Sequence, residues 1–297
     1  MKEIAPGIFV ESAYPPYNLA LIRTSQGGIV IDLPPNPLHA LNWLEQARAV
    51  ANPLRYVVMT DGKQERQFAT AACNIPIIAT TEILRAMAVY SEERGRREFA
   101  EALTSRYPDE VATLNKLAPH RPAFAFDDSF TFYAEERTLC FESIPGSAPG
   151  SLWVLVPSEN LLIAGDTVVD ETVPSLSHTP DSKAWMNTMS ALAHREAVRS
   201  IVPGRGRPVI TNGDIEPQRE FIRVMRRAAR TLLRRGSNSM SLSQTAQELG
   251  QTFFNRQGQK AVKEIKAGLE QLIREFTFED AAISEKAAAE ETIEENE

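Results

Sequence analysis

The sequence predicts an α/β protein built from two strand-rich halves, each flanked by helices. In the first half, short apolar runs rich in β-branched residues alternate with helical stretches, and we expect strands at 7–10, 17–22, 28–32, 54–60 and 75–79. A second block of strands lies within 124–169. With 297 residues, of which 43% are hydrophobic and 24% charged, the chain is long enough to bury a large core.

The helices of the first half are expected near 38–50 and 64–72, between the strands. Residues 82–117 also read as helical, and they are polar, with charges on an outer face. The second block holds four apolar runs typical of strands, at 130–133, 139–141, 152–156 and 161–164. Two β-rich halves with flanking helices fit a sandwich of sheets and helices.

Residues 215–235 have the pattern of a strongly amphipathic helix. One stripe is apolar and contains Phe221, Met225, Ala228 and Leu232, and the opposite stripe contains Arg219, Arg223, Arg226, Arg230 and Arg234. A solvated helix face explains the arginines, and a phosphate-contacting surface is the alternative. Nucleic acid is not an expected partner, because the body of the chain lacks the basic bias of nucleic-acid-binding proteins.

The residues after this helix are also expected to be helical, which makes 215–278 a C-terminal helical segment. A winged-helix unit is the alternative interpretation of 236–276, although no first strand of a wing is evident. The net charge of −7 is concentrated beyond it, because residues 279–297 contain eight acids and one base, Lys286. This Glu- and Ala-rich tail has almost nothing to bury, so we expect it to be disordered or a frayed helix.

The cysteine pattern and the hydropathy of the chain indicate in which cellular compartment the protein is expected. Cys73 and Cys140 lie singly in apolar stretches, which indicates buried free thiols in a reducing environment. Residues 1–20 lack the basic and apolar regions of a signal peptide, and no run is long enough to span a bilayer. We therefore expect a soluble, cytoplasmic protein without a membrane partner.

Four short segments occur in an order that points to a known family. The first is Thr60-Asp61-Gly62-Lys63-Gln64-Glu65-Arg66, directly after the apolar run 56–59. The others are Pro145-Gly146-Ser147-Ala148-Pro149-Gly150-Ser151, Ala164-Gly165-Asp166-Thr167 and Val202-Pro203-Gly204-Arg205-Gly206-Arg207-Pro208. They resemble, in this order, the T-H-x-H-x-D-H, P-G-H-T-P-G-S, G-D-T and V-P-G-H-G-x-P segments of the metallo-β-lactamase fold superfamily.

The resemblance implies the architecture of the chain. It extends from residue 3 to about 235 and predicts a four-layer αββα sandwich as the domain 1–214. It places a helix at 180–192, before the last core strand. It also implies that the helical segment 215–278 packs beside the active-site mouth.

The resemblance also implies what happened to the metal site. Active members hold two zinc ions by imidazoles and carboxylates, and a metal-bound hydroxide attacks an ester, thioester, amide or phosphodiester. By position, those ligands fall on Asp61, Lys63, Glu65, Arg66, Ser147, Asp166 and Arg205. Only Asp166 is unchanged, and none of the seven offers a neutral nitrogen donor. We therefore expect a degenerate metal site with no zinc, no other cofactor and no catalytic residue.

The replaced side chains balance in charge: Asp61, Glu65 and Asp166 contribute −3, and Lys63, Arg66 and Arg205 contribute +3. One interpretation is a salt-bridge network that plugs a vestigial active site. A second is an anion pocket in which the three bases receive a phosphate or carboxylate. A third keeps catalysis, with Mg²⁺ or Mn²⁺ on the three acids despite repulsion from the bases.

The remaining candidate groups give little support to metal-free catalysis. Ser147 has no histidine placed to serve as its base. His39, His120 and His194 are expected at the surface or in the core, whereas His178 could approach the mouth of the cleft. We expect a non-hydrolytic protein with a binding or regulatory role, whose partner is a small anionic ligand or an active paralogue. The alternative is a hydrolase of this fold, acting on an ester, thioester or phosphodiester, with atypical metal ligands.

Overall fold

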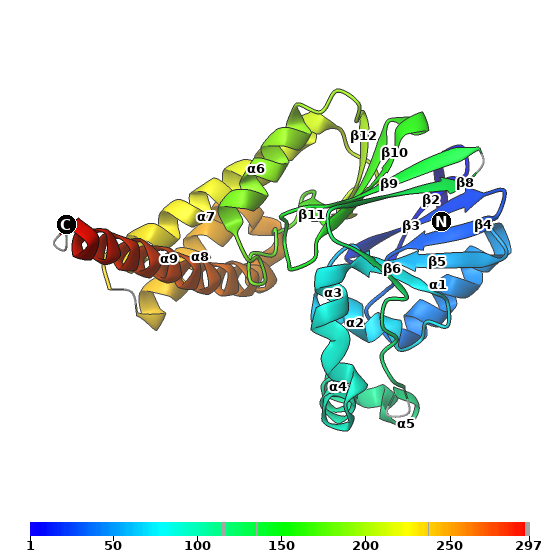
Figure 1. Cartoon of the computed structure of the whole chain (residues 1–297), viewed down its shortest axis with the longest axis horizontal. Coiled ribbons are helices and arrows are strands. Elements are labelled where there is room, and N and C mark those ends of the chain that lie inside the picture. Colours follow the sequence, from blue (N-terminus) through cyan, green and yellow to red (C-terminus); the bar gives the residue numbers. More distant parts are fainter. Residues whose placement is uncertain (115–116, 135, 237, 295–297) are drawn as a thin grey trace.

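The chain forms two β-sheets packed face to face, with helices on both outer faces (Figure 1). This arrangement is seen in a computed structural model that describes residues 1–114, 117–134, 136–236 and 238–294. The first sheet contains β1 (Lys2–Ala5), β2 (Ile8–Tyr14), β3 (Tyr17–Thr24), β4 (Gly27–Ile31), β5 (Leu54–Val58), β6 (Ile77–Thr80) and β7 (Phe124–Phe126). The second contains β8 (Ser129–Ala134), β9 (Arg137–Ser143), β10 (Leu152–Val156), β11 (Leu161–Val169) and β12 (Ser200–Arg205).

The two sheets meet along one seam. β3 pairs with β12 at a single position, Tyr17 with Arg205, so the strand order is β7-β6-β5-β4-β3-β12-β11-β10-β9-β8, with β2 and β1 attached at β3. Parallel pairs join β4 to β5, β5 to β6, β6 to β7 and β11 to β12. The inner faces bury a shared apolar core, which includes Ile22, Phe141 and Val154.

Helices cover the outer face of each sheet. On the first sheet lie α1 (Pro37–Val50), α2 (Gln64–Thr70) and α3 (Thr81–Ala86), followed by η1 (Met87–Ser91), α4 (Glu93–Arg106), η2 (Pro108–Glu110) and α5 (Val111–Leu114). On the second lie α6 (Ser182–Ala193), η4 (Asn212–Ile215), α7 (Glu216–Arg234), α8 (Ser239–Phe254), η5 (Asn255–Gln257) and α9 (Gly258–Glu294), and η3 (Pro157–Glu159) joins β10 to β11. The predicted four-layer order of helices, sheet, sheet and helices is therefore confirmed.

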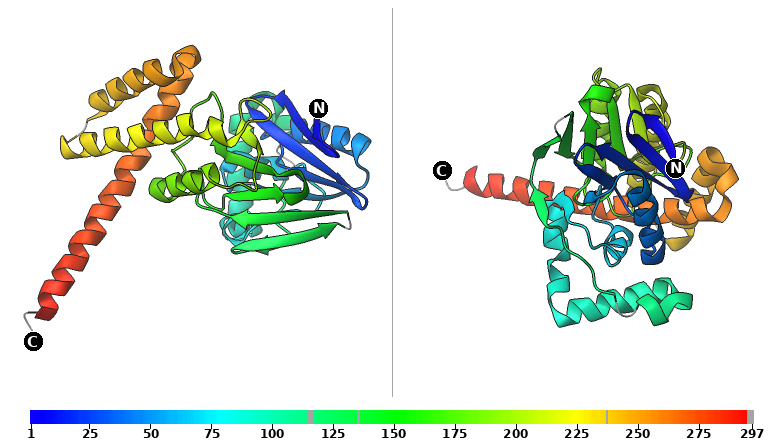
Figure 2. Two further views of the ribbon diagram at one scale, coloured as in Figure 1. Left: turned by 90° about the horizontal axis from the view of Figure 1, so that it is seen from above. Right: turned by 90° about the vertical axis from the view of Figure 1, so that its right-hand side faces the viewer.

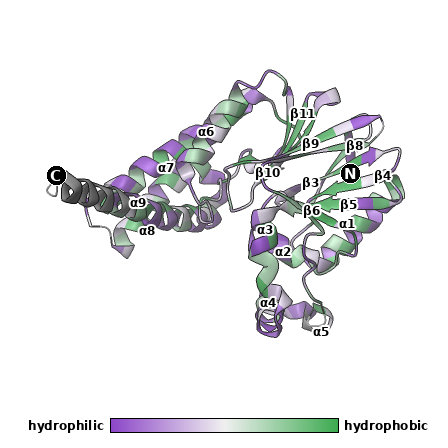
Figure 3. Cartoon of the chain, in the orientation of Figure 1, coloured by the Kyte–Doolittle hydropathy of each residue, from purple (hydrophilic) through white to green (hydrophobic). Residues whose placement is uncertain are grey.

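Local sequence explains where the helices next to the site begin. The Asn36 side chain accepts hydrogen bonds from the backbone N–H groups of Leu38 (2.8 Å) and His39 (3.2 Å), and Pro37 opens α1. Asp181 caps α6 by accepting from the Ala184 N–H at 2.8 Å. The strands are mostly apolar, whereas α4 carries polar residues along its length (Figure 3).

Most expected elements are present within a few residues of their predicted bounds. The helix expected at 180–192 is α6, and the amphipathic helix expected at 215–235 is α7. The polar stretch 82–117 is divided among α3, α4, α5 and two 3₁₀ turns, with 115–116 outside the described residues. The hairpin of β1 with β2 was not predicted, because Lys2–Ala5 is short and partly exposed.

The C-terminal helices correct one expectation. Residues 238–276 are described as α8, η5 and α9 without a strand, so the winged-helix interpretation is wrong. The tail is also helical as far as it is described, because α9 continues through 279–294 and extends away from the body (Figure 2). Glu and Ala favour helix, which agrees with the helical one of the two alternatives given for this stretch. Residues 295–297 lie outside the described residues.

The arginine stripe of α7 is less solvated than expected. Its ion pairs within α7 join Arg219 to Glu216 and Arg223 to Glu220, and those to α9 join Arg226 to Glu275 and Arg230 to Glu279 and Asp280. The guanidinium groups of Arg226 and Arg230 also lie over the ring of Phe276, at 4.9 and 3.9 Å from its centroid. Part of the stripe therefore holds α9 against α7. No helix among the described residues is long and apolar enough to cross a membrane.

Candidate functional site

The seven residues aligned with the metal ligands come together at the seam between the sheets. The loop after β5 and the start of α2 supply Asp61, Lys63, Glu65 and Arg66. The loop between β9 and β10 supplies Ser147, β11 supplies Asp166, and the end of β12 supplies Arg205. Their convergence is measured by the ion pairs and hydrogen bonds that join them, although they are up to 144 positions apart in the sequence.

The Lys63 ammonium lies among oxygen atoms from three segments. Its Nζ donates to Asp166 Oδ2 at 2.7 Å and to Ser147 Oγ at 3.2 Å, and it lies 3.6 Å from Asp61 Oδ2. The Lys63 backbone N–H donates to Asp61 Oδ1 at 3.0 Å, which fixes the turn before α2. A side-chain cation therefore occupies the space between the two aspartates.

Asp166 is the centre of the network. Its Oδ2 also accepts from Arg205 Nη2 at 2.6 Å, and its Oδ1 lies 3.6 Å from Arg66 Nη2. Burial alone would raise the pKa of Asp166, but the attraction of Arg205, Lys63 and Arg66 holds that pKa well below its ordinary value. Burial alone would lower the pKa values of Arg66 and Arg205, but the charges of Asp32 and Asp166 raise the first and the charge of Asp166 raises the second, so both guanidinium groups are charged at neutral pH.

Asp32 belongs to the network and was not predicted from the sequence. Its Oδ2 lies 3.3 Å from Arg66 Nη2, and it accepts from the Thr60 N–H at 2.9 Å and the Thr60 hydroxyl at 2.6 Å. Asp32 has a φ of +62°, which is rare for a residue with a side chain. Burial raises the pKa of its carboxyl despite the nearby Arg66. The sequence shows only that Asp32 directly follows the apolar run of β4, and this position alone does not reveal its left-handed backbone.

Tyr17 is the second member that the sequence analysis missed. The guanidinium groups of Arg66 and Arg205 lie over its ring, at 4.9 and 5.2 Å from the centroid. Its hydroxyl donates to Glu65 Oε1 at 2.7 Å, and Arg205 Nη2 lies 3.5 Å from the same oxygen. Burial and the charge of Glu65 raise the pKa of Tyr17, so the ring stays neutral.

Two glycines allow the strands that carry these groups to approach each other. Gly165 has a φ of +53°, and a Cβ there would lie 2.3 Å from Thr60 Oγ1. A Cβ on Gly204 would lie 2.4 Å from Asp166 Oδ1. Both contacts are shorter than real side chains allow, so the glycines before Asp166 and Arg205 keep the network compact.

The network is almost entirely hidden from solvent. Asp61, Lys63, Arg66, Ser147 and Asp166 are each at most 4% exposed, and Arg205 is 7% exposed. Several of its polar atoms, including Asp61 Oδ2, Asp166 Oδ1 and Arg66 Nε, have no well-aligned hydrogen bond among the described residues. Charge attraction, more than ideal hydrogen-bond geometry, therefore holds the buried groups together.

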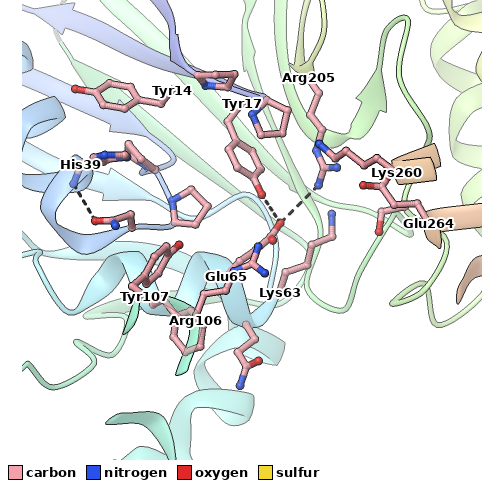
Figure 4. Close-up of a pocket in the computed structure, with 18 of the residues that line it drawn as sticks. Tyr14, Tyr17, His39, Lys63, Glu65, Arg106, Tyr107, Arg205, Lys260 and Glu264 are labelled. Atoms are coloured by element: carbon pink, nitrogen blue, oxygen red, sulfur yellow. Dashed lines mark hydrogen bonds and ion pairs between the residues drawn. The ribbon is translucent and has the colours of Figure 1, made fainter. Parts of the chain in front are cut away.

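A cleft of about 810 Å³ opens above the network (Figure 4). Lys63, Glu65 and Arg205 lie at its floor, and Tyr14, Tyr17, His39, Tyr107, Arg106, Lys260 and Glu264 contribute to its walls. His178 also lines the cleft, as its loop position suggested. Partial burial and the charge of Lys63 lower the pKa of His178, which favours its neutral form.

The arrangement does not resemble a serine nucleophile with its base. Ser147 is fully buried, and the neighbouring Lys63 Nζ donates to Asp166 Oδ2, so Ser147 has no free base beside it. Among the described residues there is also no group of three or more His, Cys, Asp or Glu side chains placed to hold a metal ion.

Solved structures with the same arrangement of sheets and helices identify the fold. A metallo-beta-lactamase family protein from Thermus thermophilus matches 94% of this chain and 96% of its own, with a TM-score of 0.64 and 17% identity. This chain has the metallo-β-lactamase fold. The DIM-1 metallo-beta-lactamase matches 75% of the chain and 96% of its own, with a TM-score of 0.56 and 13% identity.

A further structural match is a double mutant of the sec-alkyl sulfatase PisA1, with a TM-score of 0.61 and 14% identity. It matches 92% of this chain, which corresponds to 49% of the sulfatase chain. No protein-family model and no curated protein matches the sequence. The likeness therefore concerns the fold, and the chemistry must be argued from the residues of this chain.

Proposed function

We propose that this metallo-β-lactamase-fold protein is a non-hydrolytic binding protein whose former metal site is filled by its own side chains. The observation that carries the proposal is the position of Lys63 Nζ, between Asp166 Oδ2 (2.7 Å), Ser147 Oγ (3.2 Å) and Asp61 Oδ2 (3.6 Å). An ammonium group there supplies the positive charge that a metal ion would otherwise bring to the two aspartates.

The donor set does not fit a dinuclear zinc centre. Zinc takes imidazole or thiolate with few carboxylates, and the seven aligned positions contain neither of the first two. A divalent cation would also meet the charges of Lys63, Arg66 and Arg205, which already neutralise Asp166. Glu65 is no better placed for Mg²⁺ or Mn²⁺, because its Oε1 accepts from Tyr17 and faces Arg205.

Burial supports a plug rather than a deep anion pocket. Lys63 and Arg66 are each at most 4% exposed and have acidic partners, so a phosphate at their depth would have to displace those partners. A ligand would instead occupy the cleft above the plug. The role that follows is binding or regulation, with a small molecule or an active paralogue as partner.

Metal analysis tests the proposal directly. Protein expressed in medium supplemented with zinc, iron and manganese should contain well below about one equivalent of metal per chain. One equivalent or more, lost when Asp61 or Asp166 is replaced by Asn, would instead support a hydrolase with atypical ligands. The measurement uses elemental mass spectrometry on the full chain.

The plug also predicts a stability effect. Asp166→Ala leaves three buried cations without their shared partner, which should lower the free energy of unfolding by about 3 to 5 kcal/mol. Asp109→Ala, at an exposed position, is the matched control and should change it by less than about 0.5 kcal/mol. Similar small losses for both variants, measured by urea unfolding, would contradict a plug.

A further inference from the structure

The cleft above the network has a basic lining with one unused donor at its floor. Its described lining contains four basic residues, Lys63, Arg106, Arg205 and Lys260, and two acidic residues, Glu65 and Glu264. Arg205 contacts Asp166 and Glu65 through Nη2 alone. Among the described residues, Nη1 has no hydrogen-bond partner and, unlike Nε, is not among the fully buried polar atoms. A ligand oxygen in the cleft can therefore bond to Nη1.

The position of this donor is fixed before any ligand arrives. The Tyr17 ring lies 5.2 Å below the Arg205 guanidinium carbon, and Asp166 holds Nη2 at 2.6 Å. Figure 4 shows Lys260 of α9 beside Arg205, so a second positive charge lies on the same side of the cleft. Two converging cations, one rigid and one flexible, are suited to a carboxylate.

The opposite walls are flat and ring-rich. Tyr14 and His39 stand with their ring centroids 5.7 Å apart, and Tyr107 lines the cleft beyond them. The remaining lining includes Pro15, Pro16, Pro34, Pro35 and Phe68. Such walls favour an aromatic ligand body, because rings stack on or pack edge-on against each other.

We propose that the cleft binds small aromatic carboxylates, with the acid at Arg205 and Lys260 and the ring against the tyrosine and proline walls. A single negative charge fits better than a phosphate dianion, because Glu65 and Glu264 line the same cavity and repel a second charge. This inference rests on the proposed function, since it takes the cleft to be a binding site above a metal-free plug.

The test compares three probes by ligand-observed NMR titration of the full-length protein. Phenylacetate carries both the carboxylate and the aromatic ring. Phenylacetamide keeps the shape without the charge, and acetate keeps the charge without the ring. Phenylacetate should bind at least about fivefold more tightly than either of the others, which corresponds to about 1 kcal/mol. Equal binding of phenylacetamide would overturn the carboxylate site, equal binding of acetate would overturn the aromatic site, and no binding of phenylacetate would overturn both.

A matched pair of variants locates the acid. Lys260→Gln removes one charge beside Arg205, and Arg106→Gln removes one charge from the wall beside Tyr107 (Figure 4). The dissociation constant for phenylacetate should rise about fivefold in the first and less than about twofold in the second. Arg205→Lys keeps the charge next to Asp166 but loses Nη1, and it should weaken binding further. Equal effects of Lys260→Gln and Arg106→Gln would overturn the assignment, even if Arg205→Lys does not fold.

The titration is repeated with EDTA and with added zinc, which separates the two proposals. An affinity for phenylacetate that does not change with EDTA or zinc agrees with both proposals. Binding that requires zinc would overturn the metal-free plug, whereas zinc-independent failure of phenylacetate would overturn only the ligand class.

Discussion

At the scale of single residues, the site is a balance of charges that the sequence showed only in part. With Asp32 included, four acids face three bases, because the cluster of Asp61, Glu65 and Asp166 gains one more carboxylate. Burial raises the pKa of Asp32, and the nearby charge of Asp61 acts in the same direction, whereas the three bases hold the pKa of Asp166 low.

Acid should destabilise the protein through Asp166. Because the pKa of Asp166 is lowered in the folded state, its contribution is complete above the unfolded value of about 3.9 and is lost as the pH falls below it. Asp166→Asn removes this contribution, so its free energy of unfolding should fall less steeply between about pH 4 and pH 2.5 than that of the wild type. Urea unfolding across this range checks the slope, with Asp109→Asn as the control that should keep the wild-type slope.

Lys63 can be tested as a substitute for a bound cation. Lys63→Ala should leave a space lined by oxygens of Asp61, Ser147 and Asp166, and Mg²⁺ or Ca²⁺ should then raise the melting temperature by about 3 °C or more. Lys63→Met fills the same space with an uncharged chain, so its melting temperature should not respond. A response of the wild type or of Lys63→Met would show that the cation binds elsewhere.

The sequence predicted the residues supplied by contiguous motifs and missed those supplied by strand pairing. Lys63, Asp166 and Arg205 lie in motif segments whose order resembles a known family. Tyr17 enters the site only because β3 meets β12 at one residue, and Asp32 enters through a left-handed backbone after β4. Neither a single cross-sheet contact nor a positive φ at a non-glycine residue leaves a distinct mark in one sequence.

At the scale of elements, α7 shows why a stripe of one charge is ambiguous. Its periodicity located the helix and its apolar face, but its arginines were assigned to solvent. Arg226 instead donates to Glu275 of α9, 49 positions away, and both contact Ser182 at the start of α6. Whether Arg226 is exposed or packed depends on Glu275, which lies on another helix. The periodicity of α7 alone gives no information about that residue.

Glu275 should be important for the packing of α9. It is 8% exposed and accepts from Arg226 Nη1 at 2.9 Å and from the Ser182 hydroxyl at 2.8 Å. Glu275→Ala removes the ion-pair partner of the part-buried Arg226 and the acceptor of the Ser182 hydroxyl, and it should cost about 2 to 4 kcal/mol. Glu98→Ala breaks an exposed i,i+4 pair with Arg94 and should cost less than about 0.5 kcal/mol. Equal losses in chemical unfolding would refute a locking role for Glu275.

At the scale of the whole molecule, α9 serves two regions. Its first half contributes Lys260 and Glu264 to the cleft, and its apolar stripe of Ala261, Ile265, Leu269, Leu272 and Phe276 is fully buried against the second sheet's helices. Its last part extends beyond the body (Figure 2). The same helix therefore completes a core and lines the candidate binding site.

Truncation separates these parts of α9. A chain ending after Gly258 loses four large buried side chains, worth roughly 6 to 12 kcal/mol, which is comparable to the whole stability of a typical domain. That chain should not fold cooperatively. A chain ending after Ala281 keeps the buried stripe and the contacts of Glu279 and Asp280, and it should melt within about 2 °C of the full chain. Circular dichroism melts compare the two, and a large loss in the longer chain would contradict this division.

The single backbone pairing of Tyr17 with Arg205 has a consequence for how the two sheets unfold. So short a seam gives little backbone continuity, whereas the buried ions cross it, with Asp61, Lys63 and Arg66 on one side and Asp166 and Arg205 on the other. We therefore expect the ion cluster, together with the shared apolar core, to make the two halves lose structure together. Trp43 lies in the first half and Trp185 in the second, so their fluorescence reports on the two halves separately. Once the charges of the ion cluster are removed, the two fluorescence signals should no longer share one unfolding midpoint. The charged side chains at the seam would then connect the two halves of the scaffold as well as form the floor of the cleft.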